Sequence, residues 1–152
     1  MLTVTEAREI ILTTVPRLPA RTLPLADALN CVLAQDVTSP VDLPLWNNSA
    51  VDGYAVRASD LAGANENSPI HLHVTDTVPA GTATKTRVEP QTCARIFTGA
   101  PIPEGADAVV MQEDTHPHHE GYIAVTESLE PGENIRRAGD DVTKDEVVLR
   151  AG

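Results

Sequence analysis

The pattern of apolar and polar positions predicts short elements separated by frequent turns. Near the N-terminus apolar residues recur every three or four positions, which is typical of one face of an α-helix. Five residues form this face: Val4, Ala7, Ile10, Ile11 and Val15. Thr3 and Glu6 fit a capping box at the start of the helix, and Pro16 and Pro19 end it. A lone helix of this length is marginal in water, so it needs a surface on which to pack.

Further along the chain the pattern predicts one more short helix and then strands. The helix is expected over residues 25–29, with Pro24 at its start and Asn30 as a left-handed C-cap. A strand follows over residues 32–34 and Val37. Other strands are expected over residues 54–56, 70–77, 93–97, 108–111, 122–126 and 147–149. We expect the strand at 122–126 to pair with the one at 108–111 across a histidine-rich loop.

Composition supports a mostly β fold with short helices (α+β). Hydrophobic residues make up 41% of the 152 residues, which suits a globular core, and aromatic residues only 3%, so aliphatic side chains must fill that core. Twelve prolines and nine glycines favour turns over a helical bundle. The net charge of −11, without any basic run, argues against a nucleic-acid partner. An anionic ligand would need local donors that work against this charge.

The two cysteines and the apolar segments bear on location. Cys31 and Cys93 have no metal-type spacing, and we expect them to be reduced, mostly buried thiols. The N-terminus lacks the basic and apolar segments of a signal peptide. No apolar stretch approaches the ~20 residues of a membrane span. These features favour a cytoplasmic protein with no membrane partner.

The first segment with candidate chemistry is residues 47–56. Asp52 could orient water, ligate Mg²⁺ or accept a proton. It could equally accept hydrogen bonds in an Asx-turn, which is the commoner fate of aspartate before glycine. Ser49 favours a local cap over a nucleophile, because no GxSxG motif or paired histidine surrounds it.

The second such segment is the loop that follows the strand at 93–97. Gly99 lets the backbone approach a ligand closely, and Thr98 offers a hydroxyl and an N–H to an oxyanion or a phosphate oxygen. The alternative is a plain connection between two strands with a glycine turn.

Two charged segments each allow a second interpretation. Arg136 and Arg137, beside Asp140 and Asp141, could clamp a phosphate, but such mixed charges more often form a solvated, self-neutralised loop. The histidine-rich loop could bind a metal, although loop histidines are usually solvated. Its candidate ligands are His116, His118, His119, Glu113, Asp114 and Glu120.

Three motifs in this order resemble one family, the molybdopterin molybdenumtransferases (molybdenum insertases), which include bacterial MoeA and the E domain of gephyrin. The motifs are PLWNNSAVDGYAV, RIFTGAPIPEGADAVVMQE and GENIRRAGDD. The resemblance implies cytoplasmic homodimers that insert molybdate into adenylated molybdopterin with Mg²⁺ and release AMP. It also implies an active cleft between subunits, with one wall from an α/β domain and the other from a β-rich domain that carries these motifs.

Carried over residue by residue, the resemblance implies catalytic roles for Asp52 and Thr98. It implies cofactor-binding positions at Ser49, Gly53, Gly99 and Ala100, and it assigns no metal ligand to this chain. Gly53 is then expected to bend the chain so that Asp52 points into the cleft, and Gly99 to do the same for Thr98. Asn30 stands where the family commonly has glycine, and asparagine tolerates the same left-handed backbone.

The resemblance also predicts the domain organisation. A β-rich domain spans residues 42–136, and residues 22–41 and 137–152 form an elongated β-region. Residues 1–21 form a helix and linker that pack on the α/β domain in relatives. That domain is absent here, so we expect this chain alone to be an inactive fragment of the enzyme. The alternative is a self-standing, non-catalytic β-domain that acts as a binding or oligomerisation module.

Overall fold

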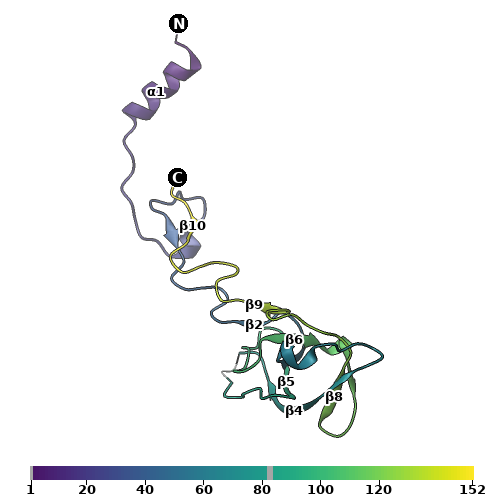
Figure 1. Ribbon diagram of the computed structural model, residues 1–152. Coiled ribbons are helices and arrows are strands. Elements are labelled where there is room, and N and C mark those ends of the chain that lie inside the picture. Colours follow the sequence, from purple (N-terminus) through teal and green to yellow (C-terminus); the bar gives the residue numbers. More distant parts are fainter. Residues whose placement is uncertain (1, 82–83) are drawn as a thin grey trace. The chain divides into compact units, whose positions relative to one another are not determined.

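The chain divides into two units. The computed structural model describes residues 2–81 and 84–152. One unit comprises Met1–Val37 and Leu149–Gly152, and the other comprises Thr38–Val148. Helix α1 belongs to the first unit and the main sheet to the second (Figure 1).

Helix α1 runs over Val4–Thr14, as the capping box predicts. The N–H of Glu6 donates to Oγ1 of Thr3 at 3.2 Å, and the N–H of Thr3 donates to Oε2 of Glu6 at 2.8 Å. No residue of the helix is buried. Its apolar face is therefore formed but has no partner within the described chain.

The rest of the first unit differs from the pattern-based expectation at three places. The second helix is a single 3₁₀ turn, η1, over Leu25–Asp27, and Asn30 has the expected left-handed backbone with φ of 65°. Residues 32–34 do not form a strand, and the strand that follows them is β1, Val37–Thr38, which pairs with β10, Val147–Leu149. Cys31 is free but exposed, so its predicted burial was wrong.

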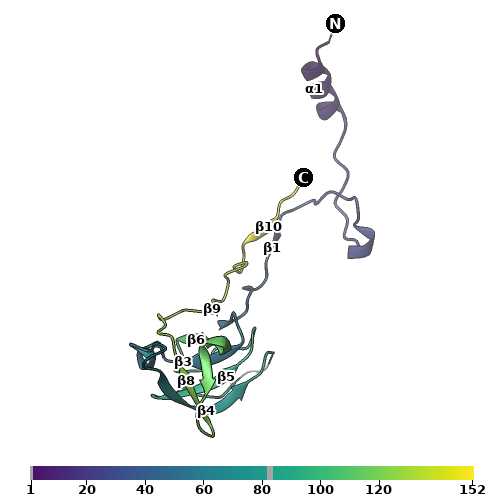
Figure 2. The ribbon, with the colours of Figure 1, turned by 90° about the vertical axis from the view of Figure 1, so that its right-hand side faces the viewer.

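The second unit is built on a six-stranded sheet (Figure 2). Its strands are β3 (Gly53–Val56), β4 (Ile70–Val78), β5 (Thr92–Ile96), β6 (Ala108–Met111), β7 (Thr115–Pro117) and β8 (Tyr122–Val125). Their order is β6-β3-β5-β4-β8-β7, with β4 and β5 parallel and the other neighbours antiparallel. A separate antiparallel pair joins β2 (Asn48–Ser49) to β9 (Ile135–Arg136). Two 3₁₀ turns, η2 (Ala58–Leu61) and η3 (Gln112–Asp114), complete the described elements.

Strands β3, β4, β5, β6 and β8 confirm the predicted positions to within one residue. Strands β2, β7 and β9 were not predicted, and one predicted pairing was wrong. Strand β8 pairs with β4 and β7, whereas β6 pairs with β3. The physical reason lies between β6 and β8. There η3 turns the chain, and Thr115–Pro117 then forms β7, which supplies the hairpin partner of β8. A hydrophobic pattern predicts where strands lie but not which strands pair with each other.

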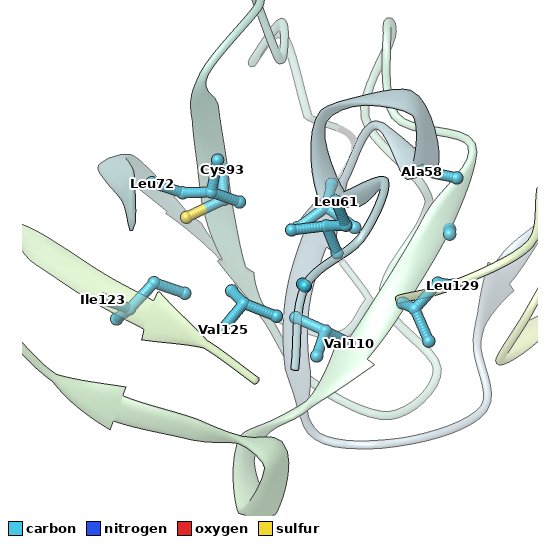
Figure 3. Close-up of a cluster of buried hydrophobic side chains, with 11 residues drawn as sticks. Ala58, Leu61, Leu72, Cys93, Val110, Ile123, Val125 and Leu129 are labelled. Atoms are coloured by element: carbon cyan, nitrogen blue, oxygen red, sulfur yellow. The ribbon is translucent and has the colours of Figure 1, made fainter. Parts of the chain in front are cut away.

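The sheet is buried on both faces in its central strands. Adjacent residues alternate between two apolar clusters, as side chains of a strand must. Ala55 and Val109 belong to one cluster, while Val56 and Val110 belong to the other. Figure 3 shows the second of these clusters, in which Leu61, Leu72, Cys93, Val110, Ile123, Val125 and Leu129 gather beside the sheet. The buried, free thiol of Cys93 agrees with the sequence prediction.

The described residues include one α-helix and mostly strands, which confirms the mostly β fold class. Within residues 2–81 and 84–152, no helix combines the length and the apolar character that a membrane crossing requires.

Candidate functional site

Asp52 and Thr98 meet although 46 residues separate them. The reason is the register of β3 and β5, which pairs Gly53 with Ile96 and so brings the residues just beyond these strand ends together. The N–H and the hydroxyl of Thr98 both donate to Oδ1 of Asp52, each at 2.8 Å. Both side chains lie on the surface. The two residues singled out by the motifs thus form one hydrogen-bonded pair.

The hydrogen bonds stabilise the charged form of Asp52. The Thr98 N–H, and after it the Thr98 hydroxyl, hold the pKa of Asp52 below its ordinary value of 3.8, and the positive charge of Arg95 acts in the same direction. Asp52 therefore keeps its charge to lower pH than an ordinary aspartate. Its second oxygen, Oδ2, receives no hydrogen bond from the described residues, so it is free to accept one from outside them.

This geometry settles what the sequence left open about local contacts. Asp52 does not act as an Asx-turn acceptor here, because its donors come from a distant loop. Both donors of Thr98 are directed to Asp52 and not to an external oxyanion.

Gly53 is required for a reason different from the expected bend. It lies in extended strand β3 between β5 and β6, and its φ is not in the left-handed region. A Cβ at this position would lie 1.9 Å from the carbonyl oxygen of Val110 and 2.9 Å from its carbonyl carbon. The glycine therefore permits the close approach of β6, which the Asp-Gly turn signal did not reveal.

Gly99, Ala100 and Ser49 tie the Thr98 loop to β2 through the backbone. Gly99 has φ of +82°, and its N–H donates to the Ser49 carbonyl at 2.8 Å. The N–H of Ser49 donates back to the Ala100 carbonyl at 3.0 Å. The Ser49 hydroxyl bonds locally to Val51, as a cap would, and it is fully buried. These residues position the loop by their main chain.

The structure adds two residues that the sequence patterns did not single out. Arg95 lies opposite Tyr54 in the β3–β5 register and bonds to the side chain of Gln112. The N–H of Gln112 donates to the carbonyl oxygen of Asp52 at 3.1 Å. Both residues lie near the ends of the motif RIFTGAPIPEGADAVVMQE, but only the register of the sheet shows that they meet beside Asp52.

The charged segment after β9 is self-neutralised. Nη2 of Arg136 lies 2.6 Å from Oδ2 of Asp141, and the N–H of Arg137 donates to Asp140 at 2.6 Å. The Arg136–Asp141 pair is about half exposed, which is typical of a surface ion pair with little net stabilisation. The geometry favours the solvated-loop interpretation over a phosphate clamp.

All five histidines of the chain lie on β4, β7 and the turn after β7. The His71 and His118 rings stack with centroids 3.7 Å apart, and the His118 and His119 centroids lie 3.8 Å apart. Loss of solvent around the ring lowers the pKa of His118, although the residue is exposed, and the charges of His119 and His71 lower it further. Over residues 2–81 and 84–152, no three or more His, Cys, Asp or Glu side chains are grouped so that they could hold a metal ion.

Comparison with known proteins places this chain in a family. Residues 2–152 match the sequence model described as "MoeA N-terminal region (domain I and II)". The chain is 44% identical over 131 residues to molybdopterin molybdenumtransferase 2 of Mycobacterium tuberculosis (strain H37Rv), covering 86% of this chain and 32% of the relative. It is 42% identical over 154 residues to molybdopterin molybdenumtransferase of Haemophilus influenzae, covering 100% of this chain and 37% of the relative.

A solved structure agrees with these sequence comparisons. The molybdopterin biosynthesis moeA protein from Pyrococcus horikoshii OT3 matches with a TM-score of 0.90 and 40% identity, over 97% of this chain and 39% of that one. Fold and sequence together define a β-rich region like the one found in molybdopterin biosynthesis proteins. The chain belongs to the MoeA N-terminal region family, which confirms the resemblance noted in its motifs. It spans about a third of the length of the curated relatives named above.

Proposed function

We propose that this chain forms the N-terminal region of a molybdopterin molybdenumtransferase, which inserts molybdate into adenylated molybdopterin and releases AMP. The observation that carries the proposal is the Asp52–Thr98 pair, which joins two motif segments at one exposed point. The names of the relatives and the match along residues 2–152 support the reaction class.

The pair suggests a role for each residue. Asp52 is the charged group, and its free Oδ2 accepts a proton or a hydrogen bond from the bound substrate. Thr98 fixes the orientation of that carboxylate, so that the free oxygen already points in one direction before the substrate binds. Ser49, Gly53, Gly99 and Ala100 hold the two backbone segments at this distance.

Magnesium, which the family resemblance implies, does not fit a site made of this chain alone. In the described part of the chain, no group of three or more carboxylate, imidazole or thiol ligands is arranged to hold a metal ion. Asp52 offers a single free carboxylate oxygen. A magnesium ion at this site would need ligands from outside these residues.

The proposal extends to assembly and location. We propose that the active enzyme is a cytoplasmic homodimer, and that the isolated 152-residue chain does not catalyse metal insertion. Two observations support the assembly and the inactivity of the isolated chain: it spans about a third of the length of its relatives, and the apolar face of α1 is exposed. Half of a cleft cannot orient a substrate, and orientation supplies much of catalysis.

The test transfers this chain into a family enzyme. The chain replaces the matching region of the Haemophilus influenzae relative, and AMP release is measured with molybdate and adenylated molybdopterin. We expect Asp52→Asn in this chimera to lower the rate about 100-fold or more, the size typical of a lost acid–base group, while circular dichroism stays unchanged.

The matched control is Asp76→Asn. Asp76 on β4 also accepts hydrogen bonds from a threonine hydroxyl, that of Thr86, and from a backbone N–H, that of Thr77. This control should keep the rate of the unsubstituted chimera. Full activity of Asp52→Asn would contradict the proposal, because an asparagine serves nearly as well as an acceptor for local hydrogen bonds.

A further inference from the structure

Arg95 lies at the centre of a set of contacts around the Asp52 segment. It is on β5, directly opposite Tyr54 of β3, so both side chains project from the same face of the sheet. The guanidinium carbon lies 5.0 Å from the ring centroid of Tyr54 and 5.0 Å from that of Phe97. Contacts of this kind with two aromatic rings restrict the plane of the guanidinium.

The same guanidinium is linked directly to the Gly53 carbonyl and, through Gln112, to the Asp52 carbonyl. Nη1 donates to the carbonyl oxygen of Gly53 at 3.1 Å, and Nη2 donates to Oε1 of Gln112 at 2.5 Å. Gln112 in turn donates its N–H to the carbonyl oxygen of Asp52 at 3.1 Å. Arg95, Gln112 and the 52–53 backbone thus form a closed ring of hydrogen bonds.

We propose that Arg95 is a positioning residue of the Asp52–Thr98 site, acting through Gln112 and the Gly53 carbonyl to fix the Asp52 carboxylate beside Thr98. The inference rests on the proposed function for its catalytic consequence, although the positioning itself is a property of this chain. A guanidinium suits the task because its donors form a rigid planar fork. A lysine ammonium keeps the charge but supplies neither the fork nor the planar stacking.

The positive charge is not the whole of this role. Arg95 helps to hold the pKa of Asp52 low, but the Thr98 N–H and hydroxyl are the larger causes. If Arg95 positions the segment, its loss must weaken the Thr98 hydrogen bonds as well as remove a charge. Charge and position can therefore be separated by comparing Arg95→Met with Arg95→Lys.

The experiment uses the 152-residue chain and NMR. The carboxyl carbon of Asp52 is titrated, and hydrogen exchange of the Thr98 amide is measured. In Arg95→Met we expect the pKa of Asp52 to rise and Thr98 exchange to accelerate about fivefold or more, as for a hydrogen bond weakened by about 1 kcal/mol. In Arg95→Lys the pKa should recover in part, whereas Thr98 exchange should stay fast.

The matched control is Arg87→Met. Arg87 is an exposed arginine of the same unit that pairs with Glu89 and Glu104, and its loss should leave both readouts at Asp52 and Thr98 unchanged. Wild-type titration and exchange in a folded Arg95→Met chain would overturn the proposal. If that variant does not fold, Gln112→Ala at an exposed position replaces it. Faster Thr98 exchange there supports the proposal, and unchanged exchange overturns it.

The two proposals fail separately. An inactive Asp52→Asn chimera, combined with an Arg95→Met chain that leaves Asp52 and Thr98 unaffected, refutes the positioning role and leaves the proposed function standing. A fully active Asp52→Asn chimera refutes the proposed function, even where the NMR changes at Thr98 occur as expected.

Discussion

Gly53→Ala should disrupt the sheet at the candidate site, because it places a methyl group where backbone already lies. The added Cβ would be 1.9 Å from the Val110 carbonyl oxygen, 2.9 Å from its carbonyl carbon and 3.2 Å from the Cα of Met111. All three atoms belong to the backbone of β6, so no side chain can rotate away. The strand itself must move or the ladder between β3 and β6 must open.

The required movement is large on the scale of a packed sheet. Ordinary van der Waals contact for a Cβ begins at 3.4 Å, so the distance to the Val110 oxygen must grow by about 1.5 Å. Strand β3 cannot retreat freely, because β5 pairs with its other edge at Gly53 and Ile96. Overpacking of well-packed interiors typically costs about 1–3 kcal/mol, and a clash with backbone on a strand held from both sides belongs at or above the upper end.

The assay is thermal and urea unfolding of the 152-residue chain, with Gly63→Ala as the matched control. Gly63 has φ of +84°, and a Cβ added there would have no heavy atom within 4 Å, so this control carries backbone strain of about 1–2 kcal/mol but no clash. Gly53→Ala should lose about 3 kcal/mol or more and lower Tm by roughly 10 °C or more. An unfolding midpoint equal to that of wild type, or above that of Gly63→Ala, would refute the close-approach explanation.

Three further outcomes are expected. The folded chain holds the pKa of His118 below its ordinary 6.5, so it takes up fewer protons than the unfolded chain as pH falls through 6.5. The stability that depends on this group is therefore lost toward lower pH. His118→Gln should reduce the fall in the urea midpoint that is measured on acidification. Burial raises the pKa of Cys93 to about 12, so a thiol reagent should label only Cys31 in the native chain and both thiols in urea; rapid native labelling of Cys93 would contradict its burial. Deleting residues 1–18 should lower self-association in sedimentation, because α1 exposes its apolar face; an unchanged sedimentation profile would mean that this face has no role in pairing.

Local features of the chain could be predicted from the sequence because they depend on neighbours in the sequence. The capping box at Thr3 and Glu6 forms as expected, and Asn30 adopts the left-handed conformation. The strand positions of the second unit follow from runs of apolar, β-branched residues. The motif resemblance also pointed to the right family and marked Asp52 and Thr98 as residues of interest.

Interactions between distant segments could not be predicted in the same way. The hydrogen bonds from Thr98 to Asp52 cross 46 residues, and they exist because β3 and β5 pair in one register. The expected pairing of the strands at 108–111 and 122–126 failed because a period-two pattern records which face of a strand is buried and not which strand lies beside it.

The sequence by itself determined where this chain forms helix α1 and strands β3, β4, β5, β6 and β8, and to which family it belongs. The tertiary structure alone decided why Gly53 is a glycine and what surrounds Asp52. A dipeptide such as Asp-Gly signals a turn, but the need for glycine arises from β6, whose carbonyl at Val110 occupies the place of a side chain. Likewise Arg95 gains its contacts with Tyr54 and Gln112 only when three strands align, because a side chain's neighbours in a sheet are set by register and not by sequence distance.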